Sequence, residues 1–583
     1  MEATSPSIET TARRRFPSMT TAQVVATTVI GAFLDRAQLR SKDPLWYHKV
    51  GGRWTPITWT EARTEVESLA AGLSAIGIGR GDRVGLIGAN SPRWVIADYA
   101  LQHLGAVPVP LYPTSTADQI AFILNKTGAR VCLIDSDELL GRLREVPPTQ
   151  VKTIVCLHRD ELGEEGLVGR RTLLEKAQQM APGILAAALK TIGPDDVATV
   201  IFTSGTDGDP KGAILTHRSL MWAAEAAADA VGVKEREVTL SYLPLAHSFE
   251  RVVTTVVPLV ATSDRWTCWF VDEIRELPSA LRSVRPTIFV AVPLVWTRLQ
   301  DRILAESTRS WLVRRLGSTV ARFLGGRILK RLGLGRCWYA VSGAAPLPSE
   351  TQRFLQSLGL PLHQGWGLTE TAALCTVQTS EDLEVGVVGA PLRGVEIRLG
   401  IDGEVLVRGP NLFSGYEGEP ELTASAIDAD GFLHTGDIGH LVEGGRLAIT
   451  DRIKDVIVTT GGRKVAPSTI EAMLTSDRVI SGAMVVGDGR SHLNVLISLN
   501  GAEASRLAGP TEGAGGLWEH PKVRARVART VAAVNRSLPD AEQLHDFAIL
   551  PFGFPDEVMT PSFKVKRRLV EDTFRETIES LYV

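Results

Sequence analysis

The residues of this sequence that most directly indicate chemistry form one short run, Thr203-Ser-Gly-Thr-Asp-Gly-Asp-Pro-Lys-Gly212. Glycines let backbone N–H groups approach phosphate oxygens, while hydroxyl groups add donors and a lysine adds positive charge. The run is not a Walker A loop, because Pro210 stands where that loop has its second glycine and no Ser or Thr follows the lysine. It predicts a loop that binds a polyphosphate, with a glycine-rich surface turn as the alternative. The predicted contacts are Thr203, Ser204, Gly205, Thr206, Gly208 and Lys211.

Strands and helices that would position this run alternate along the chain before it. Residues 61–73 have the apolar spacing of a helix, and residues 83–87 and 130–135 are short apolar runs typical of buried strands. This alternation predicts βαβ units and an α/β fold with a largely parallel sheet. Residues 199–203 continue the pattern and lead directly into the run. The run is therefore expected at the carboxyl end of a strand, where α/β folds bind ligands.

Length, composition and charge exclude several classes of protein. With 583 residues the chain is too long for one ordinary core, so more than one domain is expected. Its 44% hydrophobic and 22% charged residues argue against disorder and against a collagen-like or repeat architecture. A formal net charge of -3 gives no electrostatic case for a nucleic-acid partner. The five cysteines lack a metal-ligand spacing and suggest no disulfide framework, which favours a reducing cytoplasm.

Membrane contact, if present, is expected to be peripheral. Residues 1–20 are expected to form a polar leader, because they lack the apolar run of a secretory signal. The sequence contains no run of about 18 uncharged apolar residues, the length that a bilayer-spanning helix needs. Residues 301–336 are different, because nine basic residues oppose only two acidic ones and are interleaved with apolar residues. This amphipathic stretch could lie on an anionic membrane surface, or it could be a solvated helix pair packed on the domain. Residues 501–516, rich in Gly and Ala, predict a mobile surface loop.

Six further motifs accompany the glycine-rich run. The seven together resemble the motifs of the adenylate-forming, or AMP-binding, superfamily, in the order that this family has them, from about Trp59 to Arg568. The motif that begins at Leu243, the motif that begins at Thr560 and the basic insertion before Ser342 are most similar to the corresponding segments of long-chain acyl-CoA synthetases. The six are Leu243-Pro-Leu-Ala-His-Ser-Phe-Glu-Arg251, Ser342-Gly-Ala-Ala-Pro346, Gln364-Gly-Trp-Gly-Leu-Thr-Glu-Thr371, His434-Thr-Gly-Asp-Ile-Gly439, Asp451-Arg-Ile-Lys-Asp455 with Gly461-Gly-Arg-Lys-Val-Ala-Pro467, and Thr560-Pro-Ser-Phe-Lys-Val-Lys-Arg567.

The resemblance implies a fold and a reaction. The fold would be that of the adenylate-forming enzymes, with a large multi-sheet N-terminal α/β domain and a small, mobile α+β lid domain at the C-terminus. We expect the AMP-binding and acyl-binding domain over residues 21–450, a hinge at 451–455 and the lid over 456–583. The implied enzyme joins a fatty acid of long-chain type to AMP from ATP, with Mg²⁺ as cofactor, and then passes the acyl group to coenzyme A.

The resemblance also assigns roles to four polar residues. Lys564 matches the catalytic lysine and would bridge the carboxylate and the α-phosphate as a compact charge. Glu370 matches the glutamate associated with Mg²⁺, which prefers oxygen ligands, and Thr369 would touch the α-phosphate. Asp437 matches the acceptor of both ribose hydroxyls, a geometry that suits a carboxylate. The alternative explanations of the three charged residues are a surface lysine, a solvated turn and a helix-cap aspartate.

The remaining assignments concern the hinge, the adenine and the acyl entrance. Arg452 resembles a second ribose contact, and Lys454 occupies the hinge position, where a few turn residues would let the lid rotate between the two half-reactions. His247 matches a residue that lines the acyl entrance, although a satisfied structural histidine would also explain it. The predicted adenine site is lined by Gly343, Ala344, Ala345, Trp366 and Gly367.

Two positions depart from the family pattern. Asp207 replaces the second threonine of the phosphate loop. An aspartate carboxylate is an acceptor-only anion, so it would repel a bound triphosphate unless the carboxylate points away from the triphosphate or shares a magnesium ion with it. Trp366 stands where the family places tyrosine, and it keeps the stacking face. Two rival functions stay open: among enzymes, an acyl-AMP ligase that loads a carrier protein, and, because of Asp207 alone, a non-catalytic protein that binds nucleotide or acyl chain.

Overall fold

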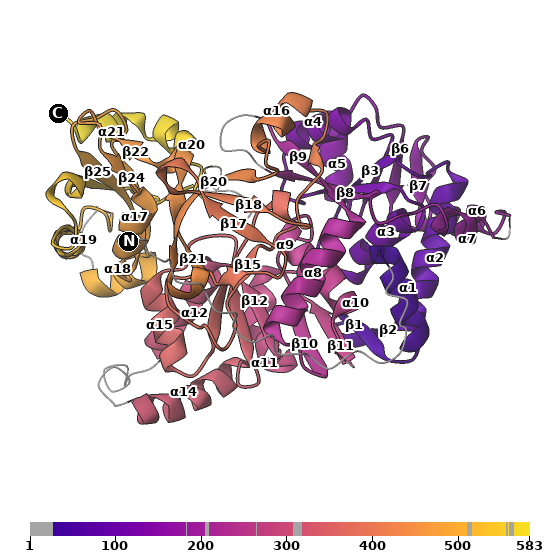
Figure 1. Ribbon diagram of the computed structural model, residues 1–583, viewed down its shortest axis with the longest axis horizontal. Coiled ribbons are helices and arrows are strands. Elements are labelled where there is room, and N and C mark those ends of the chain that lie inside the picture. The colour runs from indigo at the N-terminus through magenta and orange to yellow at the C-terminus, as the bar shows by residue number, and fades with distance from the viewer. Residues whose placement is uncertain are drawn as a thin grey trace, which may run out of the picture.

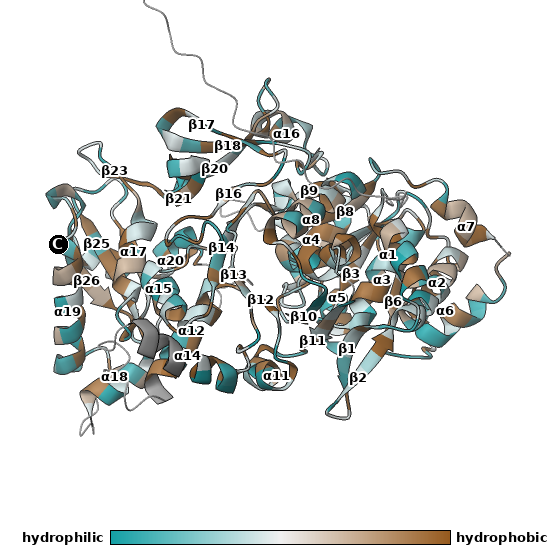
Figure 2. Cartoon of the chain, turned by 60° about the horizontal axis from the view of Figure 1, so that its bottom comes forward, coloured by the Kyte–Doolittle hydropathy of each residue, from teal (hydrophilic) through white to brown (hydrophobic). Residues whose placement is uncertain are grey.

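The computed structural model describes residues 27–181, 183–203, 209–263, 265–306, 318–509, 516–555, 558 and 565–583. Its sheets follow one another along the long axis, with the C-terminal elements at one end and the first parallel sheet at the other (Figure 1). Figure 2 shows the same order from a second direction. The expected leader, residues 1–20, lies outside the described residues.

The first large sheet confirms the predicted parallel α/β architecture. Its order is β4-β3-β5-β6-β7, and every neighbouring pair is parallel. The predicted strands are β3 and β5, and the predicted helix is α2, which begins at a capping box formed by Thr58 and Glu61. The strands are β3 (Arg83–Ile87), β4 (Val107–Leu111), β5 (Val131–Ile134), β6 (Thr153–Cys156) and β7 (Leu167–Gly169), and the helices of this region are α1 (Val29–Leu39), α2 (Trp59–Ala75), α3 (Pro92–His103), α4 (Ala117–Thr127), α5 (Asp137–Glu145), α6 (Arg170–Ala177) and α7 (Ile184–Leu189).

The strand before the glycine-rich run belongs to an antiparallel hairpin, which corrects the expectation that it continues the parallel pattern. β8 (Val197–Thr203) pairs with β9 (Lys211–Thr216), and Thr203 lies opposite Lys211. Too few residues separate the two strands for the crossover that parallel strands require. β19 (Gly415–Tyr416) pairs with the other side of β9. The run therefore begins at the carboxyl end of β8 and ends in the first residues of β9.

Two further sheets bring together segments that are distant in the sequence. Their orders are β10-β11-β1-β2 and β12-β13-β14-β15-β16. Because β13 and β14 are parallel, the motifs that follow Ser342 and Gln364 leave the sheet at the same edge. The strands are β1 (Pro44–Val50), β2 (Arg53–Thr58), β10 (Arg236–Ser241), β11 (Arg265–Phe270), β12 (Ile288–Ala291), β13 (Tyr339–Ser342), β14 (Leu362–Trp366), β15 (Thr376–Val377) and β16 (Ala390–Pro391), and the helices are α8 (His217–Val231), α9 (Ser248–Arg251), α10 (Val257–Val260), α11 (Leu277–Val284), α12 (Pro293–Glu306), α14 (Ser318–Leu332) and α15 (Ser349–Ser357).

An antiparallel sheet and a smaller C-terminal unit complete the fold. The sheet has the order β17-β18-β20-β21, and the C-terminal unit is built on the order β24-β25-β26 with hydrophobic clusters of its own. In α19 four valines on one face are buried, and the helix shows alternating hydrophobic and hydrophilic turns (Figure 2). The elements are β17 (Glu396–Leu399), β18 (Glu404–Arg408), α16 (Pro420–Ala426), β20 (Leu433–Val442), β21 (Arg446–Arg452), β22 (Ile457–Val458), β23 (Lys464–Val465), α17 (Pro467–Thr475), β24 (Ile480–Val486), β25 (Leu493–Leu499), α19 (Pro521–Asn535), β26 (Leu544–Ile549), α20 (Arg567–Thr573) and α21 (Arg575–Ser580).

The loop expected at 501–516 is wrong for its first half. Residues Gly501–Ala508 form helix α18, whose first turn is capped by the Asn500 side chain through the backbone N–H of Glu503. Ala504 and Ala508 are buried, so the alanines provide a packing face and a high helix propensity rather than a mobile loop. Residues 510–515 lie outside the described residues.

The described residues bear on two expectations from the sequence, one about the cysteines and one about membrane-spanning helices. All five cysteines are buried and free. No helix in the described part of the chain is both long and apolar enough to cross a bilayer.

Candidate active site

A single carboxylate on the antiparallel sheet is held by donors from two other strands. Asp437 lies on β20 directly opposite Arg452 on β21. Arg452 Nε donates to Asp437 Oδ1 at 2.6 Å, and the indole Nε1 of Trp366, at the end of β14, donates to Asp437 Oδ2 at 2.8 Å. The Asp437 residue is only 5% exposed. Three of the predicted site residues therefore meet at one buried acceptor.

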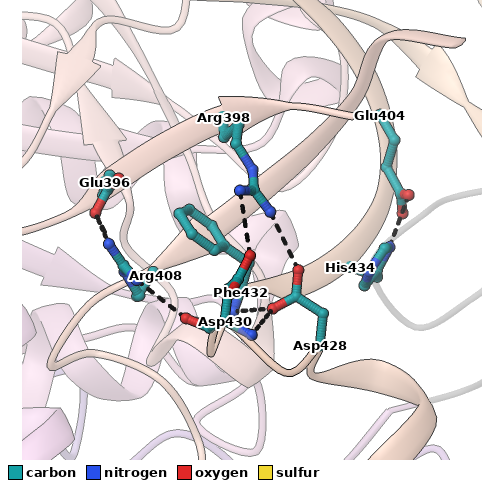
Figure 3. A network of polar contacts seen from close by, with 8 residues as sticks. All are labelled: Glu396, Arg398, Glu404, Arg408, Asp428, Asp430, Phe432 and His434. Atoms are coloured by element: carbon teal, nitrogen blue, oxygen red, sulfur yellow. Dashed lines mark hydrogen bonds and ion pairs between the residues drawn. The ribbon is translucent and has the colours of Figure 1, made fainter. Parts of the chain in front are cut away.

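Polar contacts anchor the beginning of β20 (Figure 3). Glu404 of β18 accepts hydrogen bonds from His434 at 2.9 Å and from the backbone N–H of Gly436 at 3.1 Å. The ring of Phe432 lies between two guanidinium groups, 4.2 Å from that of Arg398 and 4.5 Å from that of Arg408. These contacts fix the backbone immediately before Asp437, so its carboxylate is positioned by a rigid sheet.

A residue that the sequence analysis missed organises the part of the site that is predicted to bind phosphate. The Tyr416 hydroxyl donates to Glu370 Oε1 at 2.8 Å, and the Lys211 ammonium lies 5.8 Å from the centre of the Tyr416 ring. Burial raises the pKa of Tyr416, and the Glu370 carboxylate raises it further, so this hydroxyl stays protonated and donates. Only the pairing of β19 with β9 brings Tyr416 here, and the sequence holds no spacing that reveals it.

Because the motif resemblance implies Mg·ATP as a substrate, Tyr416→Phe is expected to weaken its use without unfolding the protein. The change leaves the ring over Lys211 but removes the hydroxyl that orients Glu370. Because hydrogen bonds to charged groups are stronger than neutral ones, kcat/KM for Mg·ATP should fall roughly tenfold. The magnesium concentration at half-maximal rate should rise in parallel. Tyr582→Phe is the matched control, since that hydroxyl donates to backbone carbonyls within the C-terminal unit; an equal shift in both variants would contradict the role of Tyr416.

Helix α9 connects the motif predicted to line the acyl entrance to the segment predicted to contact the nucleotide. His247 caps this helix, and its Nδ1 accepts from the Phe249 backbone N–H at 3.2 Å. The hydroxyls of Ser248 and Thr369 lie 3.2 Å apart. A Cβ on Gly343 would approach the Phe249 ring to 3.2 Å, so this glycine permits close packing. The motifs predicted to line the acyl entrance and the adenine are thus in direct contact.

The segments that follow β13 and β14 contain small residues that their backbone conformation requires. A Cβ on Gly367 would lie 2.3 Å from the carbonyl oxygen of Ala373, which only glycine allows. Ala344 has a φ of 69°, a left-handed conformation that costs energy for a residue with a side chain and is common at functional sites. Ala345 follows it on the same loop, and both alanines are half-buried. Gly367 therefore shapes the backbone between Trp366, which contacts Asp437, and Glu370.

Several predicted residues do not enter this geometry. Ser204, Gly205, Thr206 and Gly208, together with Asp207, lie outside the described residues, as does Lys564. Lys454 lies on the turn Ile453–Asp455 and is exposed. The described part of the chain holds no group of three or more His, Cys, Asp or Glu side chains that could bind a metal ion by themselves. A metal bound through Glu370 would therefore need further oxygen ligands from a substrate.

A buried carboxyl group within the motif Leu243–Arg251 gives stability a pH dependence. Burial raises the pKa of Glu250 to about 7, against the opposing hydrogen bonds from Ser241, Thr254 and the backbone of Tyr242. A raised folded-state pKa contributes stability that is present below the unfolded pKa and is lost as pH rises through 7. Glu250→Gln should therefore gain stability relative to wild type between pH 5 and pH 8, by at most about 3 kcal/mol. Parallel pH profiles of the two melting temperatures would contradict this.

Known proteins match nearly the whole chain. The family model of the AMP-binding enzyme matches residues 34–417, and that of the AMP-binding enzyme C-terminal domain matches residues 454–583. A long-chain-fatty-acid–CoA ligase of Mycobacterium bovis, FadD15, is 32% identical over 92% of this chain and 94% of its own length. The peroxisomal long chain acyl-CoA synthetase 7 of Arabidopsis thaliana is 31% identical over 91% of this chain and 82% of its own.

Solved structures agree on the fold. The A domain of a carboxylic acid reductase from Segniliparus rugosus, solved with AMP and a co-purified carboxylic acid, aligns with a TM-score of 0.79 at 21% identity and covers 96% of this chain and 94% of its own. A fatty acyl CoA synthetase from Mycobacterium tuberculosis aligns with a TM-score of 0.64 at 22% identity and covers 94% of this chain and 99% of its own. The architecture of two joined domains is therefore shared with these proteins.

Proposed function

Because this chain belongs to the AMP-binding enzyme family, we propose that it is a ligase that activates a fatty acid with ATP and transfers it to coenzyme A. In the first step a carboxylate oxygen attacks the α-phosphorus of ATP, a new P–O bond forms, and the bond to pyrophosphate breaks. In the second step the thiol of coenzyme A loses its proton and attacks the acyl carbon, and AMP leaves. Long-chain acids are the proposed substrates, since the relatives that match over most of their length carry that activity in their names.

The observation that carries this proposal is the geometry of residues 366–370. Trp366 contacts the Asp437 carboxylate, and Glu370, four residues later, contacts Tyr416 beside Lys211. One short segment therefore joins a carboxylate suited to ribose hydroxyls to a carboxylate and an ammonium suited to a magnesium-bound polyphosphate.

The residues divide the chemistry between them. Glu370 would hold Mg²⁺ with phosphate oxygens, and the ion would neutralise charge on the leaving pyrophosphate. Lys211 would add positive charge from β9, the strand that follows the phosphate loop. The Thr203 hydroxyl, at the end of β8, lies 3.5 Å from the Lys211 carbonyl oxygen across the hairpin. Thr369 would contact the α-phosphate, and Lys564 would bridge that phosphate and the attacking carboxylate.

We place the hinge at residues 451–455, between a nucleotide and acyl domain over 21–450 and a lid over 456–583. Asp451 supports this placement, because it is the second-to-last residue of β21 and accepts hydrogen bonds from Ser468 N at 3.0 Å and from Ser468 Oγ at 2.9 Å, at the start of α17. Burial raises the pKa of Asp451, although these hydrogen bonds act in the opposite direction. Lys454 lies on the exposed turn between the two units, where a change of φ and ψ would rotate the lid.

Peripheral contact with an anionic membrane is proposed for the basic stretch. On the described part of residues 301–336, apolar side chains such as Leu329 and Leu332 are buried while the basic ones are exposed, and α14 lies at the margin of the molecule (Figure 1). Such a face suits anionic head groups, and a packed, solvated helix has the same pattern. A cytoplasmic location fits the five free cysteines. The exposed basic residues are Arg302, Arg327, Lys330, Arg331 and Arg336.

A turnover assay and an ATP-binding assay separate the proposed ligase from its rivals. Purified protein with Mg·ATP, coenzyme A and fatty acids of graded length should form AMP and acyl-CoA in equal amounts. Pyrophosphate and acyl-AMP without acyl-CoA would instead indicate a ligase that loads a carrier protein. If no acid releases pyrophosphate although ATP binds, the chain is a binding protein. Restoration of turnover by Asp207→Thr would then identify the charge in the phosphate loop as the cause.

A further inference from the structure

The Asp437 carboxylate is fixed on both sides before any nucleotide arrives. Trp366 Nε1 donates to one oxygen at 2.8 Å, and Arg452 Nε donates to the other at 2.6 Å. A carboxylate offers about four acceptor sites, two on each oxygen. These two contacts leave about one site on each oxygen, and they hold the plane of the group from two different sheets.

We propose that Trp366 is a positioning residue for recognition of the ribose: its indole N–H holds Asp437 so that the two remaining acceptor sites receive the 2′ and 3′ hydroxyls. This inference rests on the proposed function, in which Asp437 contacts the ribose. It adds a role to the tryptophan beyond its aromatic face, because that role acts through the ring nitrogen and not through stacking.

The chemistry of the indole suits this role. An indole N–H only donates, and an ionised carboxylate only accepts, so the contact has one orientation. A tyrosine hydroxyl both donates and accepts, and its hydrogen can rotate away. The Trp366 ring is itself partly buried against the main hydrophobic cluster. A donor fixed in this way reduces the ordering that Asp437 would otherwise undergo when the ribose binds.

The test compares ATP with 2′-deoxy-ATP and 3′-deoxy-ATP in wild type and in Trp366→Phe. The variant keeps an aromatic face but loses the N–H. The preference of wild type for ATP over each deoxy analogue, measured as a ratio of kcat/KM, should shrink about tenfold in the variant. The change should lie mainly in KM, because Asp437 is remote from the bonds that break. Calorimetric binding of the same three nucleotides should give the same ratio without any turnover.

A control and an isostere make the outcomes decisive. Trp338→Phe removes a hydrogen bond of the same kind, from Trp338 Nε1 to Glu237 Oε2 at 3.2 Å, among residues with no proposed nucleotide contact, and should leave the ratio unchanged. If Trp366→Phe fails to fold, 3-benzothienylalanine at position 366 keeps the size of the ring while sulfur replaces the N–H. A KM that rises equally for all three nucleotides would overturn the inference and leave only stacking. If wild type binds these nucleotides but forms no acyl-AMP, the proposed function fails and the binding ratio still decides the role of Trp366.

Discussion

Lys564→Ala is expected to slow formation of the acyl-adenylate by about 10²–10³-fold, the loss that follows removal of one preorganised donor at a developing charge. Transfer of the acyl group from supplied acyl-AMP to coenzyme A should change little, because the lid would turn Lys564 away for that step. Pyrophosphate release in a single turnover without coenzyme A measures the first step. Acyl-CoA formation from synthetic acyl-AMP measures the second.

Lys566→Ala is the matched control for this prediction. It removes the same charge two residues away, at the N-cap of α20. Both half-reactions should keep nearly the rates of wild type. If Lys564→Ala slowed both half-reactions equally, the action of the lysine would not be confined to one orientation of the lid. The proposed rotation about residues 451–455 would then lose its support.

Asp98→Asn is expected to lower the free energy of unfolding by about 3–5 kcal/mol, the usual cost of leaving one member of a buried ion pair without its partner. The side chains of Asp98 and Arg251 are 0% and 2% exposed, and they form an ion pair. Arg251 also donates to the Thr199 hydroxyl at 2.5 Å, and Gln102 donates to Asp98 at 2.9 Å. Burial raises the pKa of Asp98 to about 6, so at pH 7 the carboxylate is still mainly ionised. Urea denaturation followed by intrinsic fluorescence measures the loss.

Replacing both partners should restore much of this loss. In Asp98→Leu with Arg251→Met no buried charge remains without a partner, and such replacements are often neutral or stabilising. Asp195→Asn is the surface control, since its ion pair with Arg218 is exposed and should not shift the midpoint measurably. A double variant less stable than Asp98→Asn would contradict the account, because it would show that shape and not charge holds α3 to α9.

Local patterns in the sequence predicted the elements of the fold better than their pairing. The apolar runs at 83–87 and 130–135 are β3 and β5, because a strand buried on both faces must be apolar throughout. The pairing of β8 was missed, since its apolar run is the same whether its partner is parallel or antiparallel. Helix α18 was missed because glycines at 501 and 509 suggested a loop, whereas the alanines between them pack against the C-terminal core.

Site residues within a motif could be predicted, but contacts between distant segments could not. Asp437 and Arg452 were both assigned to the ribose, yet the sequence does not show that Trp366 would reach the same carboxylate from another sheet. Tyr416 contacts Glu370 across 46 residues, and Arg251 contacts Asp98 across 153. Only the tertiary arrangement of strands brings these partners within hydrogen-bonding distance.

The central claim, activation of a carboxylate through its adenylate, is tested most directly with a fatty acid labelled with ¹⁸O in both carboxylate oxygens. In the proposed reaction one carboxylate oxygen forms the bond to the α-phosphorus and remains on AMP when coenzyme A takes the acyl group. Mass spectrometry should therefore find one ¹⁸O atom in each AMP formed and one in the acyl-CoA. Label in inorganic phosphate together with ADP, or AMP without label, would contradict the claim.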